Sequence, residues 1–324
     1  MTLLDAARLR LSGVEAVVAM VTSRWSDRAL RTVLWSSWVV AALLLLEVVP
    51  GGWYGLVVAV TALLLCLLPR SLPAVRRTGS RTDLLVIAAL YVGVVALMRL
   101  AFVGFTTDHV AGLFLSFAAA LILGVVGPIY YTVWRRHAGL DDLGLKVGDW
   151  RVTGVLALVF AGVQFALTLW GYDLPAPVDW VPLLVMALVV GVFESVFFRG
   201  FIQTRLEAAY GPAAGIGGAA VLYGLYHVGY GMGGSELVFL AGLGIVYAVA
   251  FAQTRSVLVL WPLLTPLGSF FNSVDSGDID LPWASIAGFV DVLAVMGVAI
   301  WLGGRHARRS RTTECPATPA VAAR

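Results

Sequence analysis

The sequence has little charge and little cysteine for a chain of 324 residues. Charged residues make up 13% of it and hydrophobic residues 60%, whereas a soluble domain typically has about 25% charged and 45–50% apolar residues. This apolar excess is larger than one buried core needs, so it excludes an ordinary soluble protein and predicts a surface that faces hydrocarbon. Because backbone groups in lipid must be satisfied within their own segment, the long apolar runs are expected to be helices.

Cysteine is nearly absent, with only Cys66 and Cys315 present. Two cysteines cannot provide the disulfide framework that stabilises a small secreted domain. Cys66 lies in an apolar run and is interpreted as a packing residue, whereas Cys315 lies in a polar tail and is interpreted as a free thiol.

Ten apolar segments have close to the 20 or so residues that cross a hydrocarbon core about 30 Å thick. They are residues 33–50, 52–69, 84–104, 110–134, 153–171, 180–206, 212–231, 236–253, 256–273 and 284–303. The sequence therefore predicts an all-α, polytopic membrane protein with about ten transmembrane helices.

Composition shifts divide the chain into five parts. These are a cytoplasmic arm (1–32), with an interfacial helix as its alternative form, four leading transmembrane helices (33–135), a polar cytoplasmic connection (136–152), a six-helix core (153–304) and a basic, disordered cytoplasmic tail (305–324). No internal repeat is evident, which counts against a transporter built from two similar halves.

The basic residues orient the predicted helices. Arginine and lysine follow the even-numbered spans, at Arg70, Arg76, Arg77, Arg81, Arg135, Arg136, Lys146, Arg205, Arg255, Arg305, Arg308, Arg309 and Arg311. The alternate loops have only acidic charges, at Asp108, Asp173, Asp179, Glu236, Asp275, Asp278 and Asp280. Since cytoplasmic loops are enriched in basic residues, both termini are expected in the cytoplasm.

Ionisable side chains within apolar spans are costly and usually mark a functional site or a structural pair. The chain has few of them at membrane depth: Glu47, Arg99, Glu194, Arg199, His227 and Asp291. Glu47 and Arg99 lie near the outer ends of their spans, where they are expected to extend toward water or to pair. Asp291 is expected either to line a polar pocket or to pair with Arg99.

Glu194 and Arg199 lie well inside the sixth span. At 100° per residue they are about 140° apart on an α-helix, so they are not expected to share a face. The residue one turn before Arg199 on its own face is Ser195. Glu194 is therefore expected to find its partner on another helix, either in an ion pair that only fixes packing or in a functional site.

His227 lies on the next span and is expected to share a face with Tyr223 and Tyr230, because the three follow i, i+4, i+7 spacing. It is either a satisfied core residue or a partner of Glu194, since a buried carboxylate beside an imidazole can act as a general base toward water. Along straight helices, the predicted boundaries put Glu194 about 20 Å and His227 about 6 Å from the outer ends of their spans. For the two side chains to meet, this difference in depth must be removed by a tilt of a helix, by a break at residues 229–234, or by span boundaries other than those predicted.

The ninth span adds neutral polar groups. Thr265, Ser269 and Asn272 also follow i, i+4, i+7 spacing, and Pro262 and Pro266 are expected to bend this helix. Such side chains serve either as hydrogen-bonding contacts between helices or as donors to an oxyanion.

Two of these segments resemble a known family. Glu194 to Arg199, followed by Gly200 and Phe201, resembles the EExxxR motif of the CPBP (Abi, or CAAX-protease) intramembrane proteases, which include the type II prenyl endopeptidases. Tyr223 to His227 resembles their FxxxH motif, and the connection from Leu143 to Arg151 resembles the segment that often precedes their core. The resemblance covers about residues 140–303.

The resemblance implies a glutamate-dependent or metal-assisted endopeptidase. Glu194 would activate water, His227 would work with it, and Asn272 would match the asparagine that closes the third motif, HxxxN. Ser195 replaces the second glutamate of the first motif, and Gly268 replaces the histidine of the third. Ser269 and Arg199 complete the set of expected catalytic residues.

A divalent metal such as zinc is one cofactor that the resemblance implies, with Glu194 and His227 as its ligands. Catalytic zinc takes about three protein ligands, and only a remote group such as Asp291 could supply the third. The alternative is a metal-free site in which Asn272, Ser269 or Thr265 donates to the oxyanion.

Three functions remain open at this point. The first is peptide-bond hydrolysis by an intramembrane endopeptidase, and the second is a catalytically inactive homologue that binds a membrane peptide or partner protein. The third is a membrane transporter. The expected partners are membrane lipid and a membrane-embedded or lipidated peptide, with no nucleic acid; the expected location is a membrane, the plasma membrane in a bacterium. Oligomeric state and substrate do not follow from the sequence.

Overall fold

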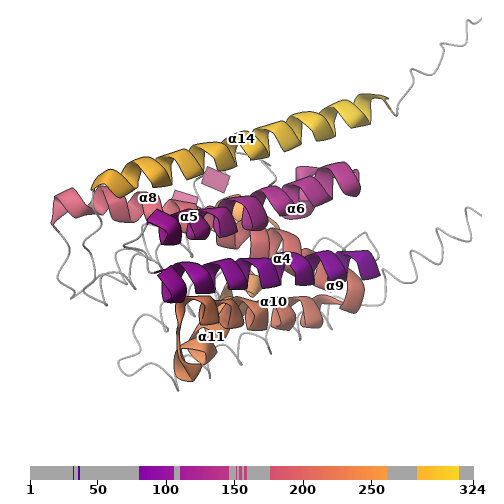
Figure 1. Cartoon of the computed structure of the whole chain (residues 1–324). Helices are drawn as coiled ribbons and strands as arrows, with labels where there is room; N and C mark the ends of the chain where they lie inside the picture. The colour runs from indigo at the N-terminus through magenta and orange to yellow at the C-terminus, as the bar shows by residue number, and fades with distance from the viewer. Residues whose placement is uncertain are drawn as a thin grey trace, which may run out of the picture.

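The computed structural model describes residues 32, 36, 80–105, 110–145, 151, 153–154, 157–158, 176–260 and 283–313. In this part of the chain every regular element is helical (Figure 1). The α-helices are α4 (Arg81–Arg99), α5 (Val110–Ala118), α6 (Gly127–Tyr130), α8 (Pro177–Glu194), α9 (Thr204–Tyr210), α10 (Pro212–Tyr226), α11 (Gly234–Thr254), α12 (Val257–Leu260) and α14 (Trp283–Thr313). The expected all-α class is confirmed for these residues.

Shorter π- and 3₁₀-helical segments extend several of these helices. The π-helical segments are Leu100–Phe105, Ala119–Val126, Tyr131–Arg135 and Ser195–Gln203. The 3₁₀ segments are Leu140–Leu143 and His227–Tyr230. As a result α4, α5–α6 and α8–α9 each belong to a longer continuous helical run.

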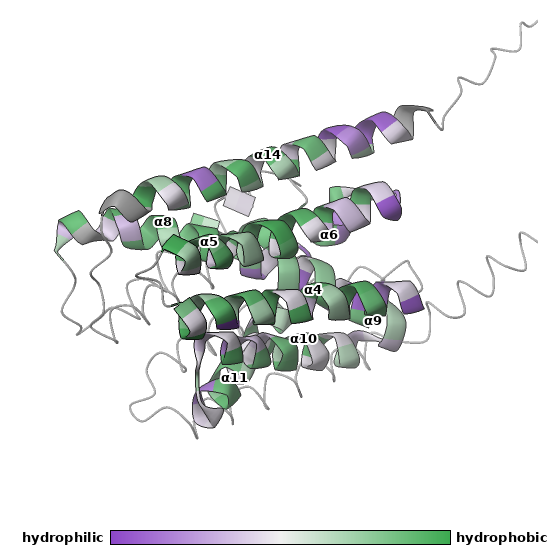
Figure 2. Ribbon diagram, viewed as in Figure 1, coloured by the Kyte–Doolittle hydropathy of each residue, from purple (hydrophilic) through white to green (hydrophobic). Residues whose placement is uncertain are grey.

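Within the described residues, five helical runs are long and apolar enough to cross a membrane. They are Arg81–Phe105, Val110–Arg135, Trp180–Tyr210, Gly234–Ala252 and Ile286–Ser310, and they match five of the ten predicted spans. Large apolar side chains such as Leu85, Val110 and Phe114 are exposed on them, as the apolar faces in Figure 2 illustrate. An exposed apolar face of this extent suits hydrocarbon rather than water, and the chain is an integral membrane protein.

The structure describes the other five predicted spans only in part. Residues 33–50 except residue 36, residues 52–69, most of 153–171, and 256–273 beyond residue 260 lie outside the described residues. The prediction of one continuous span over 212–231 is wrong, because α10 ends at Tyr226 and a 3₁₀ turn follows it. Gly231, with φ +84°, ends that turn in the left-handed conformation, which glycine adopts without strain.

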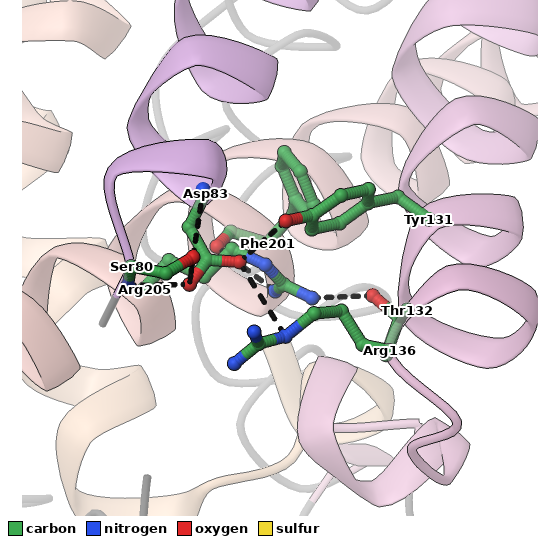
Figure 3. Close-up of polar contacts among 7 residues, drawn as sticks. All are labelled: Ser80, Asp83, Tyr131, Thr132, Arg136, Phe201 and Arg205. Carbon is green, nitrogen blue, oxygen red and sulfur yellow. Dashed lines mark hydrogen bonds and ion pairs between the residues drawn. The ribbon is translucent and has the colours of Figure 1, made fainter. Parts of the chain in front are cut away.

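A buried polar network joins the leading helices to the later ones (Figure 3). Asp83 is 2% exposed and caps the start of α4 together with Ser80. Its carboxylate accepts a hydrogen bond from Tyr131 Oη at 2.7 Å, and Arg136 Nε lies 3.6 Å from it. Thus the start of α4 and the end of the Val110–Arg135 run are held together by one carboxylate.

Arg205, at the end of the Trp180–Tyr210 run, completes this network. Both terminal nitrogens of its buried guanidinium donate, one to Phe201 O at 3.3 Å and one to Thr132 Oγ1. The guanidinium lies 4.1 Å from the centroid of the Phe201 ring, which adds a cation–π contact. The ends of three helical runs therefore share one polar cluster.

The predicted topology assigns these three ends to the same side of the membrane. In Figure 2 the hydrophilic ends of α4, of the Val110–Arg135 run and of α14 lie on the same side of the helices. The side of the membrane on which these ends and both termini lie stays a prediction.

The connection 136–152 packs against the core where it is described. Leu143 is fully buried, and its carbonyl oxygen lies 2.3 Å from the position that a Cβ on Gly200 would take. The expectation of a disordered tail from residue 305 is wrong for 305–313, because α14 continues as a helix to Thr313. Polar residues extend this helix beyond the apolar run, which a rule based on hydropathy does not detect.

A tight turn at Gly211 pairs the long α8–α9 run with α10. Gly211 has φ +89° and separates α9 from α10. Glu194 lies 17 positions before this glycine and His227 lies 16 positions after it. In an antiparallel hairpin such positions lie at about the same level, so the depth gap between Glu194 and His227 disappears when depth is counted from the turn.

Candidate functional site

The helix that contains Glu194 changes geometry at this residue. The α-helix α8 ends at Glu194 and a π-helix runs over Ser195–Gln203. Because π-helical hydrogen bonds join residues five positions apart, Arg199 lies about one turn beyond Glu194. The expectation that these two residues face apart is therefore wrong, since it assumed 100° per residue throughout.

The Glu194 carboxylate is buried among tyrosine hydroxyls. Its side chain is 4% exposed, and Tyr223 Oη donates to Oε2 at 3.1 Å. Tyr226 Oη donates to Oε1. Both tyrosines belong to α10, which confirms the prediction that Glu194 finds its partner on another helix.

His227 lies beside the same two tyrosines. Its Nδ1 is 2.9 Å from the backbone carbonyl oxygen of Tyr223, and its ring centroid is 4.1 Å from that of Tyr226 and 5.1 Å from that of Tyr223. A carbonyl only accepts hydrogen bonds, so this contact assigns the proton to Nδ1 and leaves Nε2 as an acceptor. Tyr230, at 5.5 Å, shares the face as predicted.

Arg199 is the third charged group of this site and is 2% exposed. Its guanidinium carbon lies 5.0 Å from the ring centroid of Tyr223 and 5.8 Å from that of Tyr247. Neither terminal nitrogen has a hydrogen-bond partner among the described residues, and the same holds for the buried hydroxyl of Ser195. Tyr223 therefore contacts Glu194 through its hydroxyl and Arg199 through its ring.

The sequence analysis missed two residues of this cluster, Tyr226 and Tyr247. Tyr226 is one position before His227 and lies outside the i, i+4, i+7 stripe of His227. Because it is three positions after Tyr223 and four before Tyr230, helical spacing does place it next to both tyrosines. Tyr247 lies on α11, and no spacing rule links that helix to Arg199.

Some of the other predicted site residues lie outside the part of the chain that the structure describes. Thr265, Ser269 and Asn272 lie outside the described residues. Asp291 is exposed on α14, and the expected pairing with Arg99 is replaced by a hydrogen bond from Arg99 to Val228 O at 3.0 Å. Asp291 is thus no part of the cluster around Glu194.

The described side chains do not fit a catalytic zinc site. Glu194 and His227 supply two donors where about three are needed, and Asp291 is exposed elsewhere. Within the described ranges no three His, Cys, Asp or Glu side chains are grouped so that they could hold a metal ion. The chemistry is therefore derived from the side chains alone.

This set of side chains is suited to proton transfer in a dry environment. A carboxylate, an imidazole with an accepting nitrogen and a guanidinium with unpartnered donors are surrounded by buried aromatic rings, including Phe193 and Phe198. A carboxylate beside an imidazole can take a proton from water, and a cation in a water-excluded site stabilises negative charge strongly.

Comparison with known families places this cluster within a recognised segment. Residues 175–263 match the family described as type II CAAX prenyl endopeptidase Rce1-like. No significant match to a curated protein or to a solved structure was found. Glu194, Arg199 and His227 all lie inside the matched segment, so the resemblance to the CPBP proteases is confirmed as a match of residues 175–263 to the Rce1-like family model.

Proposed function

We propose that this protein is an intramembrane endopeptidase in which Glu194 activates water for hydrolysis of a peptide bond. One observation supports the proposal above all: the buried Glu194 carboxylate and the His227 ring contact the same two tyrosines, Tyr223 and Tyr226. The family match over residues 175–263 supports the same reaction class.

The proposed reaction begins when Glu194 takes a proton from water. The water oxygen forms a bond to the peptide carbonyl carbon, and the π electron pair of the carbonyl moves to its oxygen. His227 orients the water through Nε2. Collapse of the tetrahedral intermediate then breaks the C–N bond, and the proton held by Glu194 passes to the leaving nitrogen.

The substrate we propose is a membrane-embedded or lipidated peptide. The site lies on helices that are apolar enough to span a membrane, so a peptide already held in the bilayer can reach it without crossing water. A prenylated C-terminal peptide is the first candidate, because the family description names prenyl endopeptidases.

The proposed topology has ten spans and both termini in the cytoplasm. The basic residues that follow every second span support it, as does the polar cluster that gathers three predicted cytoplasmic ends. In a bacterium the protein would lie in the plasma membrane.

A proteolysis assay in proteoliposomes tests the function. The probes are a quenched farnesylated peptide ending in a Cys-a-a-X motif, its unprenylated counterpart and a quenched apolar transmembrane peptide. We expect the wild type to cleave at least one of them, and Glu194→Gln to reduce kcat by about 10²–10⁴-fold, the usual contribution of a general base.

Asp291→Asn is the matched control, because it removes a carboxylate that is exposed on α14. It should leave cleavage unchanged. Equal cleavage by the wild type and by Glu194→Gln would remove Glu194 from the mechanism.

A catalytically inactive, peptide-binding homologue is the second candidate. The replacements by Ser195 and Gly268 of two motif residues support it, and so does the engagement of both Glu194 oxygens by tyrosines. Its signature is binding of a probe peptide without turnover, both in the wild type and in Gly268→His.

A further inference from the structure

Arg199 presents an energetic problem that the proposed base and histidine do not resolve. Its guanidinium is buried, and both terminal nitrogens lack a hydrogen-bond partner among the described residues. A buried donor left unpaired costs about 1–3 kcal/mol, and more when the group is charged. Such a group in a functional site commonly marks the place of a ligand atom.

The neighbouring carboxylate does not satisfy this cation. No ion pair between Glu194 and Arg199 occurs within the described structure. Tyr223 contacts both residues, because its hydroxyl donates to Glu194 and its ring faces Arg199. The base and the cation therefore share one tyrosine neighbour without pairing with each other.

Hydrolysis of a peptide bond produces two species that need stabilising at the same moment. One is the proton released by the attacking water, and the other is the negative charge on the former carbonyl oxygen. Glu194 accounts for the proton. We propose that the unpartnered guanidinium of Arg199 is the oxyanion-binding group, so that Arg199 is a catalytic residue.

Three features of the cluster favour this role. A guanidinium presents its terminal N–H donors in a fixed planar fork, and the ring faces of Tyr223 and Tyr247 hold that fork in place. The hydroxyl of Ser195, one turn earlier, is also buried and unpartnered and can add a second, neutral donor. Arg199 and Ser195 thereby offer two donors to the oxyanion, while the third-motif histidine is replaced by Gly268 in this sequence.

This inference rests on the proposed hydrolysis, and Arg205 provides the matched control for it. Arg205 lies on the same helical run and is also buried, but both of its terminal nitrogens have partners, and only its Nε lacks one among the described residues. The experiment compares Arg199→Lys and Arg199→Gln with Arg205→Lys and Arg205→Gln, measuring kcat, KM and Tm for each in proteoliposomes with the cleaved probe peptide.

We expect Arg199→Gln to lower kcat by about 10²–10³-fold, as loss of one oxyanion donor does. KM should change by less than about threefold, because the interaction forms only in the transition state. Tm should stay level or rise, since an unpartnered buried charge is removed. Arg199→Lys should recover little activity, because an ammonium lacks the planar fork.

Arg205→Gln should show the opposite pattern, with a lower Tm and a nearly unchanged kcat in the folded fraction. A fall in Tm for Arg199→Gln as large as that for Arg205→Gln would overturn the inference, and so would retention of wild-type kcat by either Arg199 variant. If Glu194→Gln alone abolishes cleavage while both Arg199 variants remain active, the inference fails and the proposed function survives. If the wild type cleaves no probe and Glu194 has no effect, the proposed function itself fails.

Discussion

Two arginines on one helical run, Arg199 and Arg205, are both buried but have different surroundings. Arg205 donates through both terminal nitrogens and lies in the network of Asp83 and Tyr131. Arg199 lies between tyrosine rings with its terminal nitrogens unpartnered. A buried guanidinium whose terminal nitrogens are hydrogen-bonded fixes how helices pack. One whose terminal nitrogens lack partners lowers stability but can still bind a ligand atom. The comparison separates the part of this helix that holds the fold from the part available for chemistry.

The same contrast holds for two of the buried carboxylates. Asp83 and Glu194 each accept a hydrogen bond from a tyrosine hydroxyl, but of these two only Asp83 lies within ion-pair distance of an arginine, Arg136, in the described structure. Asp83 further caps a helix through Ser80. The Asp83 network should therefore dominate stability, and the Glu194 cluster should dominate activity.

The largest expected effect on stability comes from Asp83→Ala. It removes the acceptor for Tyr131 and the Asp83 half of the helix cap, and it leaves Arg136 without its ion-pair partner. We expect a loss of about 3–5 kcal/mol, the usual cost of breaking a buried charged network, although the partly exposed Arg136 contributes little of it. Reversible unfolding in mixed micelles would measure the change.

Glu194→Gln is the matching change at the other carboxylate, and it should cost clearly less stability than Asp83→Ala. If the two variants lose equal stability, Glu194 serves the fold as much as Asp83 does, and the distinction between the two regions breaks down.

A pair of tyrosine variants sharpens the comparison with a smaller change. Tyr131→Phe and Tyr226→Phe each remove one hydroxyl that donates to a buried carboxylate. Tyr131→Phe should lower stability by about 2 kcal/mol, the value of a hydrogen bond to a charged group, and leave kcat unchanged. Tyr226→Phe should lower kcat by about tenfold, because Glu194 is then held by Tyr223 alone. Cleavage assays and unfolding curves on the same preparations would decide between these patterns.

The sequence was sufficient to predict the helical class and to single out Glu194, Arg199 and His227 as candidate site residues. Long apolar segments and rare intramembrane charges are strong signals. It also predicted which helix ends share a side, which the cluster of Asp83, Arg136 and Arg205 supports. These features depend on composition and on counting along the chain.

The sequence was not sufficient for the relation between Glu194 and Arg199. That relation depends on a change from α- to π-helix at Ser195, and no residue pattern marks such a change. Tyr247 was missed for a different reason, because contacts between α11 and Arg199 depend on how helices pack. The polar end of α14 was missed because a helix can continue beyond the apolar run that predicts it.

A last comparison concerns the segment between the two arginines. Gly200 follows Arg199, and a Cβ there would lie 2.3 Å from the carbonyl oxygen of Leu143. Because a backbone atom cannot move aside as a flexible side chain can, Gly200→Ala should cost about 3 kcal/mol, the upper end of the usual cost of overpacking, and shift the π-helical register that positions Arg199. Gly217→Ala is the matched control, because a Cβ on this α10 glycine meets no atom within 4 Å. If Gly200→Ala lowers kcat while Gly217→Ala does not, close packing of the connection holds Arg199 in place; equal behaviour of the two variants in cleavage and unfolding would mean that Leu143 does not constrain the site.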